Sequence, residues 1–296
     1  MRLVMLGGWG QLGSDLVSVA EGRHDLIRPP HAEVDVTDES QVGAAVRRAR
    51  PDVVIDAAAF HKVELCEEDP GRSFAVNAVG GWNAARAAAA AGARSVYVST
   101  DYVFDGLKPE GYDEESTPAP INVYGVSKAA GERLVRNACP DSLIVRGSGL
   151  FGHAGSSGKG GNFVETMLAK AGAGEAISVV DDQVFSPTST RDMAERILLF
   201  LERGVPSGIY HAANRGACSW YQFAEEIFRA AGLDPDLSPR PAGDQAVRRP
   251  SSSVLLDTRS AALGLPSSRS WQEAVRWYIE ARPASIQASA ENGTHR

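Results

Sequence analysis

A tyrosine and a lysine four residues apart, Tyr124 and Lys128, form the pair in this chain best suited to acid–base chemistry. They lie in the segment INVYGVSKAAGE, which is typical of a helix whose first turn Asn122 could cap. Residues four apart share one helix face, about 6 Å apart along the axis. An ammonium beside a phenol favours the phenolate, so Lys128 is expected to lower the pKa of Tyr124. The pair also occurs in ordinary helices, so its meaning depends on the rest of the chain.

A glycine-rich turn near the N-terminus supplies part of that context. Gly7, Gly10 and Gly13 directly follow an apolar segment typical of a strand and precede a helical segment. Such glycines permit a tight turn in which backbone N–H groups reach a pyrophosphate at a helix N-terminus. The nucleotide-hydrolase loop would need Lys and Ser or Thr after the last glycine, and Ser14 and Asp15 do not supply them. The turn therefore favours a dinucleotide.

The end of the second expected strand bears on which dinucleotide is bound. An acidic residue there would bind the ribose hydroxyls of NAD. The sequence has LIRPPH instead, with Arg28 and His31, and positive charge suits the extra phosphate of NADP. NADP(H) is favoured over NAD(H), with two surface cations as the open alternative.

A hydroxyl pair, Ser99 and Thr100, ends the fourth expected strand. Doubly wound sheets bind their ligands at the carboxyl ends of strands, where these hydroxyls could hold a ligand carbonyl. A strand-end hydroxyl, the Tyr124–Lys128 pair and a dinucleotide turn together are much rarer than any one of them.

The elements that must position these residues alternate along the first half of the chain. Apolar strands separated by helices predict an α/β fold, a Rossmann doubly wound parallel sheet with helices on both faces. A glycine- and serine-rich segment interrupts this alternation from Gly152 on, which predicts a smaller C-terminal substrate-binding domain after it. The expected parts are an NAD(P)-binding core over 1–152, joined by later strands near 176–180 and 208–213, a mainly substrate-binding part over 153–282, and a disordered tail over 283–296. The expected strands are 2–6, 25–28, 52–59, 94–100 and 142–147, and the expected helices are 11–21, 39–50, 73–91 and 122–137.

Composition excludes several other classes of protein. The 296 residues carry a net charge of −7, which disfavours nucleic acid as the main partner. Three scattered cysteines fit a reducing compartment, and neither they nor the six histidines have metal-ligand spacing, so no metal site is expected. No apolar run is long enough for a membrane span, and no export signal is evident, so a cytoplasmic protein without membrane contact is expected.

Four motifs in order, GGWGQLG, AVNAVG, VSTDYVF and YGVSK, make the chain resemble the extended short-chain dehydrogenases/reductases. Within that superfamily the chain is most similar to the dTDP-4-dehydrorhamnose reductases, from Met1 to about Ile279. The more specific likeness lies in RPDVVIDAAA, NFVETML, STDYVFDG, DDQVFSPT, GIYHAAN and RRPSSSVL.

The resemblance implies NADPH-dependent reduction of the 4-keto group of a nucleotide-linked 4-keto-6-deoxy sugar. It implies that Tyr124 is the proton donor and that Lys128 holds the nicotinamide ribose. It further implies that Thr100, with Ser99, binds the ketone and that Asn77 serves a proton relay. The expected partner is a dTDP-linked nucleotide sugar. A homodimer is the default expectation for such folds.

Binding residues follow from the same motifs. The expected cofactor-binding residues are Gly7, Gly10, Gln11, Leu12, Gly13, Arg28, His31, Asp35, Val36, Ala57, Ala58, Ala59, Ser99, Tyr124 and Lys128. The expected substrate-binding residues are His61, Val63, Thr100, Tyr102, Tyr124, Gly149, Asn162 and Arg249. Arg249 is the expected partner of the diphosphate.

Two positions depart from the family pattern. His61 stands where the family usually has Thr, and Gly149 stands where many members have an aromatic residue. A missing ring at Gly149 would leave room and remove a stacking surface. Both positions are expected near the reacting sugar, so they bear on which substrate is used.

Three other functions remain open at this level. One is a ketoreductase acting on a differently shaped substrate. Another is a superfamily epimerase that retains NAD, whereas a dehydratase is disfavoured because Tyr102 follows Asp101 where dehydratases have Glu. The last is a non-catalytic NADP-binding regulatory subunit.

Overall fold

The computed structural model describes residues 1–154 and 161–283. Within them the central element is a six-stranded sheet of order β10–β5–β4–β3–β1–β2, and every neighbouring pair is parallel. The expected doubly wound parallel sheet is therefore confirmed. Because β2 and β3 lie on opposite sides of β1, the chain reverses its winding direction between β1 and β3, where such sheets bind ligands. The strands are β1 (Arg2–Leu6), β2 (Asp25–Ile27), β3 (Val53–Asp56), β4 (Arg94–Thr100), β5 (Ser142–Gly147) and β10 (Gly208–His211).

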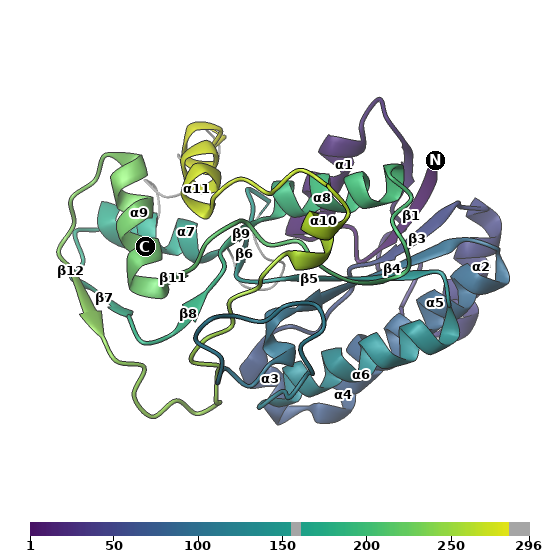
Figure 1. The fold of residues 1–296 in the computed structure, drawn as a ribbon, viewed down its shortest axis with the longest axis horizontal. Coiled ribbons are helices and arrows are strands. Elements are labelled where there is room, and N and C mark those ends of the chain that lie inside the picture. Colours follow the sequence, from purple (N-terminus) through teal and green to yellow (C-terminus); the bar gives the residue numbers. More distant parts are fainter. Residues whose placement is uncertain (155–160, 284–296) are drawn as a thin grey trace.

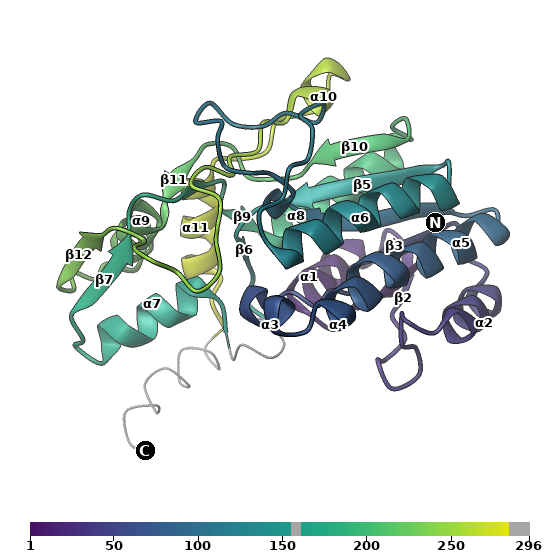
Figure 2. The same ribbon diagram turned by 90° about the horizontal axis from the view of Figure 1, so that it is seen from below.

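Helices cover both faces of this sheet (Figures 1 and 2). One face carries α1 (Gln11–Ala20) and α8 (Thr190–Glu202), whose apolar residues share a core with β1, β3 and β5. The other face carries α2 (Glu39–Ala49), α5 (Gly81–Ala90) and α6 (Val123–Ala138). Burial on both faces explains the continuous apolar strands seen in the sequence.

The helix expected over 73–91 is three segments instead of one. It is divided into α4 (Pro70–Phe74), a π-helical stretch η1 (Ala75–Gly80) and α5. The wider π turn carries Asn77, whose buried side chain accepts a hydrogen bond from Phe60 N at 2.9 Å. π-helical stretches are frequent at functional sites.

The C-terminal part packs against one end of the sheet around its own core of aromatic and aliphatic side chains. Its helices are α7 (Phe163–Gly172), α9 (Trp220–Ala231) and α11 (Trp271–Glu280). Three small two-stranded sheets complete it: β6 (Leu150–Phe151) with β9 (Thr188–Ser189), β7 (Ile177–Val180) with β12 (Leu237–Arg240), and β8 (Val184–Phe185) with β11 (Cys218–Ser219).

The expectation that the strand near 176–180 joins the large sheet is wrong. Among the described residues β7 pairs with β12 alone, and its burial alternates, with Ser178 exposed between buried Ile177 and Val179. Such alternation is typical of a sheet covered on one face, whereas central strands of the large sheet such as β3 and β5 are buried on both. By contrast, the segment 208–213 supplies the edge strand β10, and α8 also packs on the large sheet, so the two parts are interleaved along the chain.

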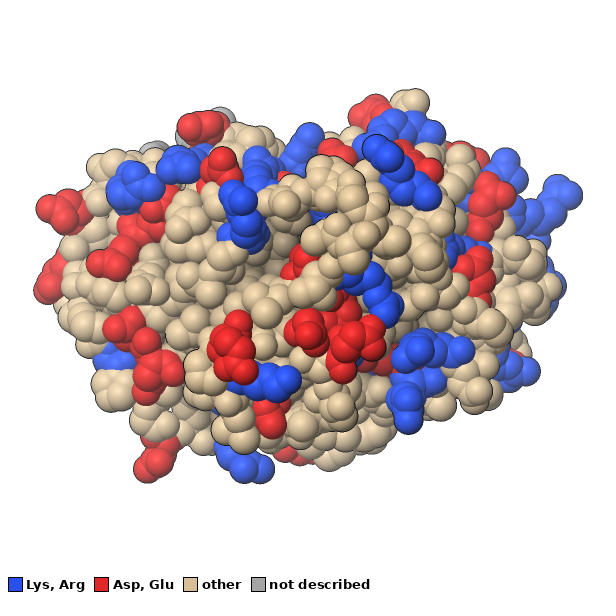
Figure 3. All heavy atoms as spheres, in the orientation of Figure 1, with Lys and Arg blue, Asp and Glu red and all other residues tan. Residues whose placement is uncertain are grey.

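Short helices complete the fold: α3 (Val63–Glu68), the 3₁₀ turn η2 (Asp101–Val103) and α10 (Thr258–Ala262). Acidic and basic side chains are interspersed on the face shown in Figure 3. None of the helices in 1–154 and 161–283 combines the length and apolar character that crossing a bilayer requires. The disordered tail expected over 283–296 lies, from residue 284 onwards, outside the described part of the chain.

Candidate active site

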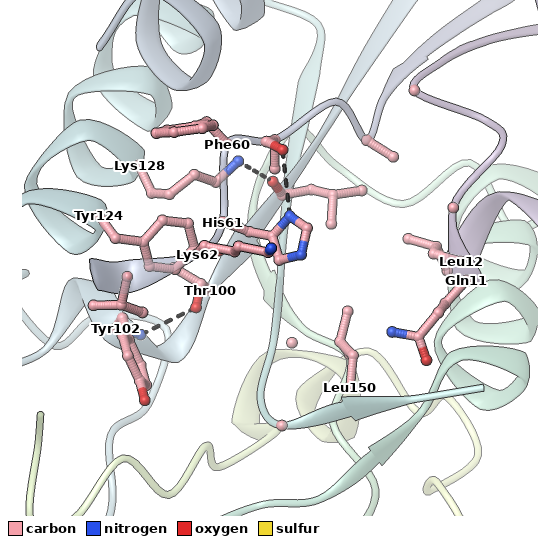
Figure 4. A pocket seen from close by; sticks show the side chains of 18 of the residues that line it. Gln11, Leu12, Phe60, His61, Lys62, Thr100, Tyr102, Tyr124, Lys128 and Leu150 are labelled. Carbon is pink, nitrogen blue, oxygen red and sulfur yellow. Dashed lines mark hydrogen bonds between the residues drawn. The ribbon is translucent and has the colours of Figure 1, made fainter. Parts of the chain in front are cut away.

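A pocket of about 1150 Å³ lies between the carboxyl edge of the large sheet and the C-terminal part. All but two of the site residues expected from the sequence line it. Figure 4 shows Tyr124, Thr100 and Tyr102 together on one side, His61 beside them, and Gln11 and Leu12 on the opposite wall. The lining residues that were expected are Gly7, Gly10, Gln11, Leu12, Gly13, His31, Asp35, Val36, Ala57, Ala58, Ala59, His61, Val63, Ser99, Thr100, Tyr102, Tyr124, Lys128, Gly149, Asn162 and Arg249.

The glycine turn fits a dinucleotide. Gly7 has φ +70°, and a Cβ there would lie 2.4 Å from the backbone N of Ala58, so only glycine lets β1 and β3 approach so closely. Gly10 is the N-cap of α1 without a side-chain hydrogen bond, and a Cβ there would meet nothing nearer than 4.0 Å. The N-terminus of α1 therefore opens towards the pocket with N–H groups available to an anion.

The far end of the pocket is lined by His31, Asp35 and Val36. Hydrogen bonds from Thr37 lower the pKa of Asp35 and hold its carboxylate in place. Arg28 is not among the lining residues; its guanidinium lies over the ring of the exposed Trp9, 4.0 Å from the ring centroid. A cation is thus present beside this end of the pocket, one residue from lining residue Pro29.

The proposed proton donor is carried by α6. Asn122 caps this helix as expected, accepting a hydrogen bond from Gly125 N at 2.8 Å. A Cβ at Gly125 would lie 2.1 Å from the carbonyl oxygen of Tyr102, so glycine at this position lets α6 contact η2. This close contact brings Tyr124 into hydrogen-bonding range of Thr100 at the end of β4.

The pKa of Tyr124 does not shift as expected from the sequence. Burial raises it, and the hydrogen bond with Thr100 opposes this rise only in part. Lys128 Nζ donates to Val98 O at 2.6 Å and lies over the ring of Tyr97. The expected lowering by Lys128 is wrong here because desolvation of the phenol outweighs any stabilisation of its charged form. A raised pKa keeps Tyr124 protonated at neutral pH.

Lys128 is itself buried, and burial lowers its pKa to about 8. Two carboxylates, Asp56 and Glu132, oppose this change. Burial raises the pKa of Asp56 to about 6, against the effect of the Lys128 ammonium. Within the described residues, Asp56 Oδ2 has no hydrogen-bond partner. Lys128, which lines the pocket, and Asp56, which does not, are thus a buried pair of opposite charge.

Asn77 is the second expected residue that does not line the pocket. Its side-chain nitrogen donates to Phe60 O and to Ser127 Oγ, both at 2.9 Å, while Tyr97 OH donates to its backbone oxygen. These bonds fasten the segment before His61 to α6. A part in a proton relay stays a prediction.

Thr100 is held by a fully buried carboxyl group that the sequence argument did not assign. Thr100 Oγ1 donates to Asp101 Oδ1 at 3.1 Å, and Asp101 Oδ2 accepts from Ser148 at 2.7 Å and from Ser253 at 2.5 Å. Burial raises the pKa of Asp101, and the hydroxyl donors oppose this. Asp101 therefore connects the strand-end Thr100 to β5 and to the C-terminal part.

Gly149 does not leave empty space, contrary to the expectation. It has φ +50°, and a Cβ there would lie 2.2 Å from the ring of Phe185. Phe185 fills the volume that a side chain at 149 would need, and it reaches Gly149 from a strand of the C-terminal part. His61, the other departure, lines the pocket close to Tyr124 (Figure 4).

Among the residues expected to bind substrate, Arg249 forms an ion pair with Glu64 of α3, and both side chains line the pocket. Tyr102 lies edge-on to Tyr124 with ring centroids 5.9 Å apart, and burial raises its pKa to about 12. Asn162 caps α7 and donates to Gly152 O at 2.8 Å, so its side chain also closes the pocket wall. Val63 is buried at the start of α3.

Four residues of this site were not predicted from the sequence: Asp56, Asp101, Phe185 and Trp220. A charged residue at the end of the apolar segment VVID was a usable signal for Asp56. The aromatic residues carried no such signal because their positions depend on packing between distant segments. In 1–154 and 161–283, no group of His, Cys, Asp and Glu side chains is arranged to hold a metal ion.

Comparisons with known proteins identify relatives over nearly the whole chain. The family model described as RmlD substrate binding domain matches residues 1–283. A dTDP-4-dehydrorhamnose reductase of Mycolicibacterium smegmatis is 40% identical over 287 residues, covering 93% of this chain and 84% of that protein. The spore coat polysaccharide biosynthesis protein SpsK of Bacillus subtilis is 35% identical, covering 96% of this chain and 99% of that protein.

Solved structures of reductases are similar to this chain over nearly its whole length. A dTDP-4-dehydrorhamnose reductase of Bacillus anthracis in complex with NADP is similar with a TM-score of 0.89 and 38% identity. The match covers 94% of this chain and 99% of that one.

Proposed function

Because the chain belongs to the RmlD family and is an NAD(P)-dependent oxidoreductase of the dTDP-4-dehydrorhamnose reductase type, we propose that it reduces the 4-keto group of a dTDP-linked 4-keto-6-deoxy sugar with NADPH. One observation carries the proposal. A protonated Tyr124 in hydrogen-bond contact with Thr100 lines the same pocket as a glycine turn at the N-terminus of α1.

The proton needed by the reaction comes from Tyr124. When bound, the nicotinamide supplies the hydride to C4 of the sugar. Thr100 donates its hydroxyl proton to the C4 oxygen in place of Asp101, and Tyr124 transfers its phenolic proton to that oxygen as negative charge develops. The raised pKa of Tyr124 keeps the proton in place until then.

The remaining residues bind and orient. Lys128, protonated below a pKa of about 8, holds the nicotinamide ribose. The backbone at Gly7, Gly10 and the start of α1 binds the pyrophosphate. Arg28 and His31 support a preference for the 2′-phosphate of NADPH, and the NADP complex of the Bacillus anthracis relative is consistent with it.

The test is a nicotinamide oxidation assay with dTDP-4-keto-6-deoxy-L-mannose, comparing NADPH with NADH. Tyr124→Phe is expected to lower kcat by roughly 10²–10⁴-fold, the usual range for loss of a general acid. Tyr221→Phe removes a phenol on α9 that does not line the pocket, and it is expected to leave kcat unchanged.

Two results would contradict the proposal. Full turnover by Tyr124→Phe would exclude this phenol as the proton donor. No turnover by the wild-type protein, with NADPH still bound in a direct titration, would favour a different ketone or a regulatory role.

A further inference from the structure

A pair of stacked aromatic rings occupies the pocket wall beside Gly149. The ring of Phe185, from β8, lies against the Cα of Gly149. The ring of Trp220, the first residue of α9, stacks on Phe185 with centroids 4.0 Å apart and an interplanar angle of 22°. Both residues line the pocket, and we call them the Phe185–Trp220 wall.

The wall is held rigidly from behind. Phe185 is 3% exposed and meets Phe223 edge-on, and Trp220 packs against Phe163 with centroids 4.8 Å apart. Pairing of β8 with β11 joins the two ring-bearing segments directly. A rigid aromatic surface binds a ligand with little loss of conformational entropy.

The wall is also close to the reacting centre. Gly149 follows Ser148, which donates to Asp101, and Asp101 in turn accepts from Thr100. Phe185 therefore borders the part of the pocket that contains Thr100. A group packed on this wall lies near the expected position of the C4 oxygen.

We propose that the Phe185–Trp220 wall is the surface on which the 6-deoxyhexose ring of the substrate packs, in place of a side chain at position 149. This inference rests on the proposed function. A 6-deoxy sugar presents apolar carbon at C5 and C6, and burying it on an aromatic surface is favourable. The phenyl ring of Phe185 offers no hydrogen bond to a 6-hydroxyl, so a hydroxylated sugar would lose its hydration there without compensation.

The experiment separates the sugar from the nucleotide. Calorimetry would give Kd for dTDP, dTDP-L-rhamnose and NADPH with the wild-type protein, Phe185→Leu and Trp220→Leu. Phe185→Leu keeps an apolar side chain and most of its volume in the core and removes the aromatic face. We expect Phe185→Leu and Trp220→Leu to raise the Kd of dTDP-L-rhamnose roughly tenfold, as for other changes of apolar contact. The Kd values of dTDP and NADPH are expected to stay unchanged.

Phe228→Leu is the matched control. Phe228 is a buried aromatic residue of α9 that does not line the pocket, and its substitution is expected to change none of the three Kd values. Equal weakening of dTDP and dTDP-L-rhamnose by Phe185→Leu would overturn the proposal, because the wall would then contact the nucleotide. Unchanged binding of both would overturn it as well, because the rings would be purely structural.

The proposed function fails in a different way. A wild-type protein that binds NADPH but neither dTDP compound would contradict the assigned substrate itself. Normal wild-type turnover and binding, insensitive to Phe185→Leu, would contradict only the wall.

Discussion

At the scale of single residues, burial governs the protonation states of this site. It raises the pKa of Tyr124, lowers that of Lys128 to about 8 and raises that of Asp56 to about 6. Each shift has the sign expected when a charged form loses hydration. Opposite charges nearby reduce the shifts of Lys128 and Asp56 without reversing them, whereas the charge of Asp101 adds to the rise at Tyr124. The outcome suits reduction, because at neutral pH the phenol is in the protonated form that an acid requires and the lysine remains cationic.

A pH profile tests the Lys128–Asp56 pair. The kcat/KM for NADPH-dependent reduction is expected to fall as pH rises through about 8, because Lys128 then loses the charge that we propose holds the ribose. Asp56 raises the pKa of Lys128, so Asp56→Asn is expected to move this fall to lower pH.

Asp52→Asn is the control, since Asp52 is an exposed residue that precedes β3, at the opposite end from Asp56. It should leave the profile where it is. A profile that Asp56→Asn does not move would mean that Lys128 is not the titrating group.

At the scale of elements, the site depends on how closely α6 approaches η2. Tyr124 reaches Thr100 because Gly125 lets the helix lie against the Tyr102 carbonyl. The π-helical stretch η1 has a related role, since Asn77 joins the segment preceding His61 to α6. The distance between α6 and η2 thus decides how Tyr124 and Thr100 lie relative to each other.

Gly125→Ala tests this spacing. A Cβ 2.1 Å from a backbone oxygen forces α6 outwards, so we expect a loss of about 1–3 kcal/mol in the free energy of unfolding and a lower kcat. Urea unfolding and the reductase assay would measure the two effects.

Gly43→Ala in α2 is the matched helical control. The added Cβ would meet only the flexible end of Arg47. The variant is therefore expected to have a free energy of unfolding about 0.5–1 kcal/mol higher, with kcat unchanged. Equal changes in the free energy of unfolding and in kcat for the two variants would show that the α6–η2 contact tolerates a side chain.

At the scale of the whole molecule, the pocket is shared by the two interleaved parts, and an ion pair spans it. Glu64 comes from α3 on the sheet side, and Arg249 comes from the segment after β12. The guanidinium that is expected to bind the diphosphate therefore already has a carboxylate partner. Ligand and Glu64 would compete for the same cation. Formation of a homodimer stays a prediction at this scale.

Glu64→Gln is expected to strengthen dTDP binding by up to about fivefold, the equivalent of the ~1 kcal/mol that an exposed ion pair can contribute. Arg249→Gln is expected to weaken it, most at low ionic strength, because screening reduces the attraction as salt is added. Calorimetry at two salt concentrations would measure both.

Glu115→Gln breaks an ion pair with Arg259 that does not border the pocket, so it should leave dTDP binding unchanged. Weaker binding in Glu64→Gln would contradict competition and would indicate that Glu64 positions Arg249.

The sequence by itself determined the features that depend on neighbouring residues. Apolar periodicity gave the order of strands and helices, and the glycines between β1 and α1 indicated a dinucleotide turn. The spacing of Tyr124 and Lys128 placed both on one face of α6, and Asn122 predicted where that helix begins. These inferences succeed because helix and strand geometry relates residues close in sequence.

Only the tertiary structure decided the features that depend on distant segments. It showed that β7 pairs with β12, that Phe185 fills the space over Gly149, and that burial reverses the expected pKa shift of Tyr124. The physical reason is common to all three. Strand pairing, the occupation of a volume and the loss of hydration are set by whichever parts of the chain pack together, and local spacing carries no record of that packing.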